Sequence, residues 1–517
     1  MIERDHSTRP SLRARRLGID TYRENVIYMH AECEVCRSEG FESQARVLVS
    51  SGSARIPATL NVVTSELLHQ GEAGLSEVAW AALNASEGDE LRVEHMAPPI
   101  SMSHVRAKVY GRRLGIGDYK AIVDDVVAGR LSSVEIAAFL TACAVDRLNP
   151  EEVASLTMAM LDAGDRLTWP SKVVADKHCI GGLPGNRTTP IVVAIVAACG
   201  GVIPKTSSRA ITSPAGTADV METLAPVDLD LVSMRRVVET EGGCIAWGGS
   251  VALSPADDVL IRVERPLDLD SEGQLVASVL SKKAAAGSTH VVIDMPVGPT
   301  AKVRTREAAA NLRALFESVA PRAGLRLRIV ETNGGAPVGR GIGPALEARD
   351  VLGVLRQTAD APRDLRDRAL ALAGSVLELT GIAAAGSGNA IASQTLQSGR
   401  ALTKFERICE AQGGMRQPTV ASYTRAVIAQ AEGIVTSIDN RRLARAAKLA
   451  GAPRDAAAGI VLDVGLGGVV ERGQPVFTLH AESPGELAYA AEYVNSQDPI
   501  VTICPDDQRG TATGGSQ

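Results

Sequence analysis

The spacing of apolar and polar residues changes several times along the chain. In the first hundred residues, β-branched residues alternate with polar ones between turn residues, which predicts short strands at 43–53, 55–63 and 89–96. Segment 65–83, between these strands, has the apolar spacing of a helix. This pattern is typical of a small α+β domain.

Helical spacing dominates from 103 to 168. Ser132 with Glu135, and Asn149 with Glu152, have the spacing of capping boxes, in which each side chain caps the backbone of the other residue. Helices are therefore predicted to begin directly after Ser132 and Asn149.

A third pattern begins near residue 172. A short strand, a glycine-rich polar loop and an apolar helix follow one another in 172–201, and the same order returns in 202–224. Repeated strand–loop–helix units predict a parallel sheet, whose ligands lie at the carboxyl ends of the strands. Both loops are therefore expected at one edge of the sheet. Helical spacing returns at 256–287, and 288–303 and 325–335 have the pattern of further strands and loops.

We predict a multidomain α/β fold with four parts. They are a small N-terminal α+β domain, a helical domain, a large parallel-sheet α/β domain that binds phosphate, and a C-terminal α+β domain with a barrel-sandwich-like pattern. Their predicted ranges are 1–100, 103–170 (joined by about 255–287), 171–420 and 424–505, and the first 20 residues or so are predicted to form a disordered basic arm.

Composition narrows the classes of function. Lys and Arg number 54 against 60 Asp and Glu, and aromatic residues are 3%, which argues against a nucleic-acid partner. No apolar stretch has the length of a membrane span and no secretory signal is recognisable, so no membrane partner and a cytoplasmic location are expected. The scattered eight cysteines are expected to be reduced.

His30, Cys33 and Cys36 form a fragment of a zinc-ligand pattern. A closed zinc site needs four ligands, and the chain has no second Cys-x-x-Cys. We favour ordinary thiols over a zinc site and predict no metal.

The two polar loops carry the candidate chemistry. Glycine N–H groups, helix N-termini, hydroxyls and cations converge in sites that hold tetrahedral anions. The first loop offers Lys177, Gly181, Gly182, Gly185, Asn186, Thr188 and Thr189. The second offers Lys205, Thr206, Ser207, Ser208, Arg209, Thr212, Ser213, Gly216 and Thr217. Neither contains the P-loop pattern. We interpret them as an anion pocket, and the alternative is a pair of ordinary turns.

The motifs "DKHCIGGLPGNRTTPIVVAIVAACGG", "PKTSSRAITSPAGTADVMETL", "SVLSKKAAAGSTHVVIDMPVG" and "GQPVFTLHA" resemble the thymidine phosphorylase family. The resemblance is closest to its type 2 branch, which includes archaeal AMP phosphorylases. It covers about residues 103–500 and implies an active site in a cleft between the helical and α/β domains. It also implies a homodimer or larger homo-oligomer. The implied reaction is phosphorolysis of an N-glycosidic bond in a nucleoside or nucleotide, with phosphate as co-substrate and no cofactor.

The resemblance also implies roles for individual residues. Lys177, Thr189, Ser207 and Thr217 match the phosphate ligands, and Cys179 stands where nucleoside-specific members have serine. Ser278 and Lys282, four residues apart on one helix face, match a pair that reaches the pyrimidine ring. The set of the AMP-cleaving members is matched by Gly182, Ser208, Arg209, Ala210, Ile211, Thr212, Ser213, Thr217, Ser278 and Lys302.

His178 and Asp270 are the predicted catalytic residues. His178 matches a family histidine near base and phosphate, and we favour a functional over a structural role because an imidazole pKa suits proton transfer. Asp270 matches a proton donor to the leaving base; the equal alternative is a cap of the helix starting at Ser271.

Two substrates remain open: a nucleoside such as thymidine, or a nucleoside 5′-monophosphate whose extra phosphate the second loop would hold. An anthranilate-type phosphoribosyltransferase, which would need Mg²⁺, is a remoter alternative. The segment "DVGLGGVVERGQPVFTLHA" resembles biotinyl and lipoyl carriers but lacks their lysine, so we interpret the C-terminal domain as an assembly domain. A scaffold without phosphate affinity is the non-enzymatic alternative.

Overall fold

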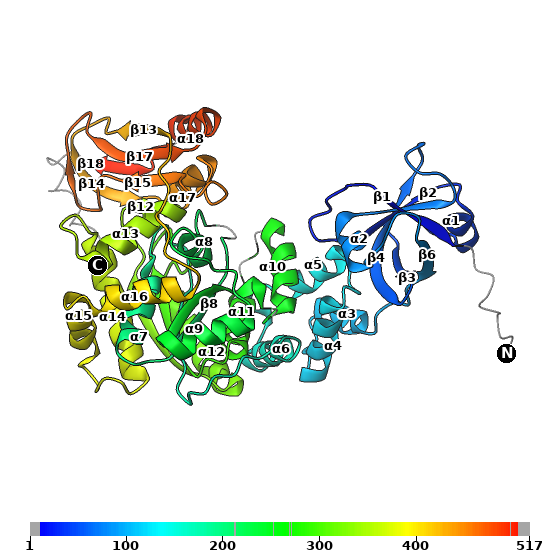
Figure 1. The fold of residues 1–517 in the computed structure, drawn as a ribbon, viewed down its shortest axis with the longest axis horizontal. Coiled ribbons are helices and arrows are strands. Elements are labelled where there is room, and N and C mark those ends of the chain that lie inside the picture. Colours follow the sequence, from blue (N-terminus) through cyan, green and yellow to red (C-terminus); the bar gives the residue numbers. More distant parts are fainter. Residues whose placement is uncertain are drawn as a thin grey trace. The chain divides into compact units, whose positions relative to one another are not determined.

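The computed structural model describes residues 11–210, 213–251, 253–267, 269, 271–496 and 498–504. Its contacts divide the chain into two compact units (Figure 1). Unit 1 comprises 1–148 with 255–271, and unit 2 comprises 149–254 with 272–517. The four-part division made from the sequence stays a prediction, and the two units are described in turn.

Unit 1 contains a closed six-stranded barrel with the strand order β1-β5-β2-β4-β3-β6. Its interior is made of fully buried side chains such as Ile27, Met29 and Leu60. The strands and the two short helices beside them are β1 (Leu12–Arg16), β2 (Val26–His30), α1 (Glu34–Glu39), β3 (Arg46–Ser51), β4 (Ala54–Val63), β5 (Glu72–Leu75), α2 (Glu77–Ala82) and β6 (Glu90–His95).

Two sequence predictions are wrong in this barrel. Residues 1 to about 20 are predicted from the sequence to be a disordered arm, but Leu12–Arg16 form strand β1, which pairs with β5 in parallel and with β6 antiparallel; residues 1–10 lie outside the described residues. The predicted helix 65–83 contains strand β5, and its helical part is only α2, which begins after the Ser76 cap. Pairing with distant strands overrides the local helical spacing.

Cys33 and Cys36 have structural roles in the barrel. The Cys33 Sγ accepts a hydrogen bond from Cys36 N (3.1 Å) and so caps α1, while the Cys36 thiol donates to Phe41 O (3.6 Å). Burial raises the pKa of both thiols. Raised pKa values disfavour the thiolate form that a metal would need.

Among its described residues, unit 1 also contains the helices α3 (Ser101–Val109), α4 (Ile116–Val127), α5 (Ser133–Ala142) and α10 (Pro255–Leu267). The capping box of Ser132 and Glu135 is present at the start of α5, as the sequence predicted. In unit 2, Asn149 and Glu152 form the predicted box at the start of α6 (Pro150–Asp162).

The α/β part of unit 2 has parallel strands, as predicted, and they form a three-stranded and a two-stranded sheet. Strand β10 (His290–Val297) lies between β11 (Arg326–Asn333) and β7 (Ala175–Cys179), and all pairings are parallel. Strand β8 (Ile203–Ser207) pairs in parallel with β9 (Gly243–Trp247). It begins beside β7, where Ala175 N donates to Val202 O (2.8 Å). Strands β7 and β8 are the two strands that precede the polar loops.

Helices pack around these strands and share a hydrophobic core with them. Helix α7 (Thr188–Ala198) is buried from Thr188 to Ala197, and its Ile191 and Ile195 share a hydrophobic core with Val292 of β10 and Ala373 of α14. The other helices are α8 (Thr217–Glu222), α9 (Leu231–Glu241), α11 (Glu272–Ala285), α12 (Arg306–Val319), α13 (Pro344–Arg356), α14 (Arg363–Leu379), α15 (Gly388–Gln397) and α16 (Arg400–Ala411).

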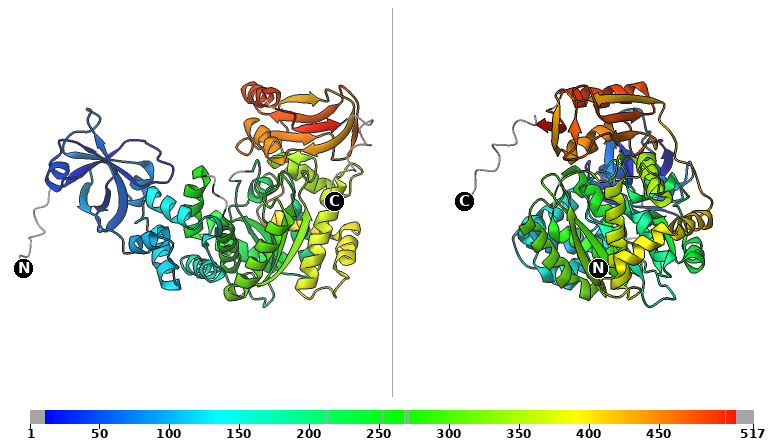
Figure 2. Two further views of the ribbon diagram at one scale, coloured as in Figure 1. Left: turned by 180° about the vertical axis from the view of Figure 1, so that it is seen from behind. Right: turned by 90° about the vertical axis from the view of Figure 1, so that its left-hand side faces the viewer.

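The C-terminal part of unit 2 holds two small antiparallel sheets with helices α17 (Asn440–Leu449) and α18 (Pro484–Ser496). One sheet has the order β16 (Val469–Val470), β14 (Gly433–Ile438), β18 (Val501–Cys504), and the other β12 (Gly341–Ile342), β15 (Gly459–Leu462), β17 (Pro475–Ala481), β13 (Tyr423–Ile428). Strand β12 comes from the segment just before α13, and Figures 1 and 2 both show α13 beside these strands.

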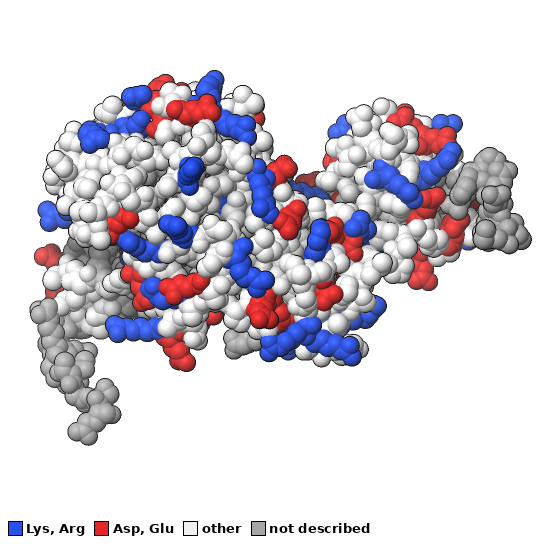
Figure 3. Space-filling model, turned by 90° about the horizontal axis from the view of Figure 1, so that it is seen from below, with Lys and Arg blue, Asp and Glu red and all other residues white. Residues whose placement is uncertain are grey.

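Charges of both signs are interspersed on the face drawn in Figure 3, in line with the nearly balanced composition. Among the helices that the structure describes, none is long and apolar enough to cross a lipid bilayer.

Candidate active site

The two polar loops leave the carboxyl ends of the neighbouring strands β7 and β8. The loop after β7 ends at the first turn of α7, and the loop after β8 ends at the first turn of α8. Lys177, on β7, donates from Nζ to Thr188 Oγ1 (2.7 Å), so the strand's cation meets the N-terminus of α7. A cation beside a helix N-terminus is the arrangement expected for anion binding.

Asp294, on the neighbouring strand β10, contacts side chains at the end of β7 and in the loop that follows it. Its carboxylate lies 3.7 Å from Lys177 Nζ and accepts hydrogen bonds from Asn186 Nδ2 (3.2 Å) and Thr332 Oγ1 (2.7 Å). Asp294 is fully buried and Lys177 is 1% exposed. Asn186 also donates to Cys179 Sγ (3.3 Å), and burial, reinforced by Asp294, raises the pKa of that thiol to about 12.

A second buried carboxylate, Asp176, holds two more lysines. Its oxygens lie 2.8 Å from Lys283 Nζ and 3.4 Å from Lys205 Nζ, and it accepts from Ser288 Oγ (3.3 Å). Burial acts to raise the pKa of Asp176, but the two lysines outweigh it and the pKa is lowered. Burial in turn lowers the pKa of Lys205 to about 7, against the opposing effect of Asp176.

His178 lies among these cations. Its side chain is partly exposed, yet protein encloses the ring; this desolvation, followed by the surrounding positive charges, lowers the pKa of His178 well below its ordinary value. The charges belong to Lys283, Lys205, Lys282 and Lys177. His178 is therefore neutral near pH 7 in the protein without ligand, whereas the sequence argument used an ordinary imidazole pKa. Proton transfer by His178 stays a prediction.

Arg187 joins the two loops. It precedes α7, and its Nη1 donates to Thr217 Oγ1 (2.6 Å) while Nη2 donates to Ala215 O (3.0 Å). On its other side, Nε donates to Glu347 Oε2 of α13 (2.8 Å). Burial raises the pKa of Glu347 to about 7, with Arg187 acting in the opposite direction.

The second loop uses part of its hydrogen-bonding capacity internally. Asp219 Oδ2 accepts from Ala210 N (2.6 Å) and Gly216 N (2.8 Å). Arg209 is bound to Glu222, with an Nη2–Oε1 distance of 3.0 Å, and lies over the ring of Trp247. These groups are therefore engaged within the protein before any ligand arrives.

Gly182 brings the first loop against the segment after β10. Its φ is +87°, and a Cβ at this position would lie 2.2 Å from Lys302 N. Only glycine fits such a backbone at such a distance. The close approach places the exposed residue Lys302 beside the first loop.

The structure thus brings together many predicted residues and adds others. Lys177, His178 and Lys282 share one cationic cluster, and Thr217 is linked to the first loop through Arg187. Thr189 is buried in the first turn of α7, Ser207 ends β8, and Ser278 lies one turn before Lys282 on α11. Ser208 and Ser213 lie in the second loop. Asp270, Ile211 and Thr212 lie outside the described residues.

Five residues of the site were not predicted from the sequence: Asp176, Asp294, Lys283, Arg187 and Glu347. Four of them, Asp176, Arg187, Lys283 and Asp294, stand inside the quoted motifs, but their partners are remote in the sequence. Within the described part of the chain, no group of three or more His, Cys, Asp or Glu side chains is arranged to hold a metal ion.

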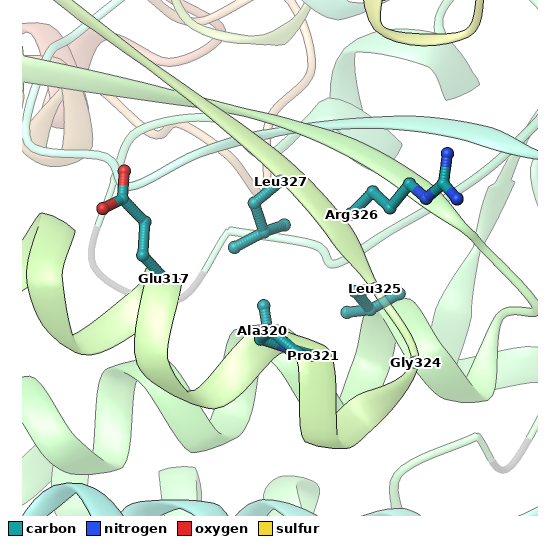
Figure 4. A pocket seen from close by; sticks show the side chains of 7 residues that line it. All are labelled: Glu317, Ala320, Pro321, Gly324, Leu325, Arg326 and Leu327. Carbon is teal, nitrogen blue, oxygen red and sulfur yellow. The ribbon is translucent and has the colours of Figure 1, made fainter.

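The surface also has a hollow between the end of α12 and the start of β11 (Figure 4). Its lining includes Glu317, Pro321 and Arg326. Because β7, β10 and β11 run in parallel, this hollow lies at the amino edge of the sheet, opposite to the loops. It is not part of the candidate active site.

Comparison with known proteins agrees with this architecture. Residues 103–164 match the helical bundle domain of a glycosyl transferase family, and 171–402 match the a/b domain of that family. Residues 434–501 match the pyrimidine nucleoside phosphorylase C-terminal domain.

Individual relatives cover nearly the whole chain. A protein of Polaromonas sp. is 64% identical over 495 residues, which is 96% of this chain and 97% of the relative. A Legionella pneumophila protein is 60% identical over 492 residues, 95% of each chain. Both bear the name of a thymidine phosphorylase, given provisionally.

Among solved structures, anthranilate phosphoribosyltransferase of Saccharomyces cerevisiae, in complex with PRPP and Mg, is similar in fold. Its TM-score is 0.50 at 17% identity, over 62% of this chain and 99% of that one. This likeness shows the fold of a helical bundle joined to an α/β domain.

Fold, site and relatives together define a glycosyltransferase-type enzyme of the nucleoside phosphorylase class. The chain belongs to the thymidine phosphorylase family.

Proposed function

We propose that this enzyme cleaves the N-glycosidic bond of thymidine with phosphate, giving thymine and 2-deoxyribose 1-phosphate. The observation that carries the proposal is the contact between the two loops at the carboxyl ends of the neighbouring strands β7 and β8. Lys177 Nζ donates to Thr188 Oγ1 (2.7 Å), and Arg187 Nη1 donates to Thr217 Oγ1 (2.6 Å). Four lysines and two buried carboxylates lie at these strand ends, so positive charge is in excess there and favours binding of an anion. The names of the relatives support thymidine as the nucleoside.

The chemistry needs a held phosphate rather than a bound cofactor. A phosphate oxygen attacks the anomeric carbon, the bond from that carbon to the base nitrogen breaks, and its electron pair leaves with the base. Fixed donors around the phosphate align it, and the anion stabilises the positive charge that develops on the sugar. We assign phosphate binding to Lys177, Thr189, Ser207 and Thr217, and base contacts to Ser278 and Lys282.

Proton supply to the base is the remaining requirement. His178, neutral near pH 7 without ligand, gains a proton more readily once an anionic phosphate lies in the lysine cluster, since the anion offsets the charges that lower its pKa. We therefore propose His178 as a hydrogen-bonding partner of phosphate and base. Asp270 stays the proposed acid for a purine leaving group.

A nucleoside 5′-monophosphate is the second candidate substrate. The approach of Gly182 to Lys302 N favours it, because this contact adds a cation beside the first loop. Against it, Arg209 and the backbone N–H of Ala210, both in the set matched to AMP-cleaving members, are bound to Glu222 and Asp219. The loops would need to open before these groups could hold a second phosphate.

The test is phosphate-dependent base release from thymidine, uridine, cytidine, AMP, CMP and UMP, without added metal. Release from thymidine supports the proposal. Release from the monophosphates alone would replace it with the second candidate, and silence across the panel would refute both. A homo-oligomer in the cytoplasm is the proposed setting, and sedimentation of the purified chain tests the oligomer.

A further inference from the structure

The guanidinium of Arg187 is the only described side chain that hydrogen-bonds to both α8 and α13 from the first loop. Its side chain is 12% exposed and that of Glu347 is 1% exposed. It donates to a hydroxyl and a carbonyl of the second loop, Thr217 Oγ1 (2.6 Å) and Ala215 O (3.0 Å), and to the carboxylate of Glu347 (2.8 Å). Three separate segments of unit 2 thus meet at one side chain.

This contact fixes the direction of the Thr217 hydroxyl. A guanidinium only donates, so Thr217 Oγ1 must accept from Arg187 and use its own O–H toward another acceptor. No acceptor for that proton occurs among the described residues. Thr188 is in the same situation, because its Oγ1 accepts from Lys177 (2.7 Å). Both hydroxyls therefore present protons, as binding of an anion requires.

Glu347 anchors the guanidinium. Its second oxygen accepts from Gly343 N (3.1 Å), and the residue lies in the first turn of α13. With one carboxylate oxygen fixed by backbone and the other by Arg187, the fork of Arg187 keeps a single orientation toward Thr217. Lysine, as a point charge, could not replace this geometry.

We propose that Arg187 is a positioning residue, which acts through Thr217 by turning its hydroxyl toward the phosphate. The inference rests on the proposed function, because it takes phosphate as the ligand of Thr217. It assigns a role to a residue that none of the matched family contacts includes.

A double-mutant cycle tests the inference, with Arg187→Ala and Thr217→Val measured singly and together. Each single change should raise the KM for phosphate by about 10- to 100-fold, the range expected for a lost hydrogen bond to a charged group. The double variant should be no worse than Thr217→Val. Arg187→Lys should not restore the KM, whereas Thr217→Ser, which keeps the hydroxyl, should stay near wild type.

Glu241→Gln is the matched control, since Glu241 is a buried partner of Lys404 and Arg407 remote from the loops. It should lower the melting temperature without changing the KM for phosphate. If Arg187→Ala fails to fold, Arg187→Gln takes its place in the cycle. An unchanged KM, or losses that multiply in the double variant, would overturn the inference.

Failure of the proposed function gives a different result. If the wild-type enzyme releases no base from any substrate, the same cycle is run on the Kd of inorganic phosphate by calorimetry. Non-additive losses of phosphate affinity would then uphold the role of Arg187 although the reaction is refuted, and additive or absent losses would overturn it.

Discussion

Gly182→Ala tests whether the first loop is built around its contact with Lys302. An added Cβ would lie 2.2 Å from Lys302 N, about 1.2 Å short of the 3.4 Å at which ordinary contact begins. The facing atom belongs to the backbone, so no rotamer change relieves the clash, and the loop or the segment after β10 must move by about 1 Å. A misplacement of 1 Å in an active site can cost about 100-fold in rate.

The neighbouring Gly181 provides the matched control. Its φ is +97°, against +87° for Gly182, but a Cβ there meets nothing within 4 Å. Both alanine variants therefore carry the left-handed backbone strain of about 1–2 kcal/mol, and only Gly182→Ala adds the clash. We expect kcat/KM for thymidine phosphorolysis to fall by about 100-fold in Gly182→Ala and by much less in Gly181→Ala.

Steady-state kinetics with thymidine and phosphate, combined with thermal unfolding of both variants, gives the comparison. Equal activity of the two variants would refute the reasoning, because the clash would then have no effect on the site. A large loss in Gly181→Ala would also refute it, since strain alone would explain the result.

Three other outcomes are expected. Asp176→Asn leaves Lys205 and Lys283 buried without their shared carboxylate, so the free energy of unfolding should fall by about 3–5 kcal/mol, and an unchanged urea midpoint would contradict the ion pairs. The pKa of Lys205 is lowered from 10.5 to about 7, so between these two pH values the unfolded chain binds one proton more than the folded protein, and the free energy of unfolding should rise with pH. Lys205→Met should flatten this rise, and an unaltered slope of the free energy of unfolding against pH would argue against the shift. The pKa of Cys179 is raised to about 12, so iodoacetamide should label this thiol slowly at about pH 8, as followed by mass spectrometry, and rapid labelling would disprove its shielding.

The sequence was sufficient for elements whose signals are local. The capping boxes at Ser132 and Asn149 start helices as predicted, and the polar loops follow parallel strands. In the barrel, local patterns were misleading, because β5 (Glu72–Leu75) has no alternation of β-branched residues. Its extended backbone is imposed by pairing with β1 and β2, which lie far away in the sequence.

In the candidate active site, too, local signals were predictable from the sequence and long-range contacts were not. Lys177 and the glycines stand out within one motif, but Arg187 gains its significance from Glu347, 160 residues further on. Asp176 likewise acts through Lys205 and Lys283, which belong to two other elements. Periodicity and motif spacing contain no information on such pairings, which arise only when the sheet places the segments side by side.

Strand β12 limits how this protein could be taken apart. Gly341 and Ile342 pair with Val461 and Ile460, so the edge strand of this C-terminal sheet comes from a segment more than a hundred residues before β15, the strand with which it pairs. Val338, just upstream, accepts from Asn186 N (2.8 Å) of the first loop. A C-terminal fragment cut near residue 420 would expose a bare strand edge, and a chimaera made with a relative's C-terminal domain would have to carry 338–343 along. The last part of the chain is therefore not an independent module: in recombination or engineering, it must be moved together with segment 338–343, which contacts the first polar loop.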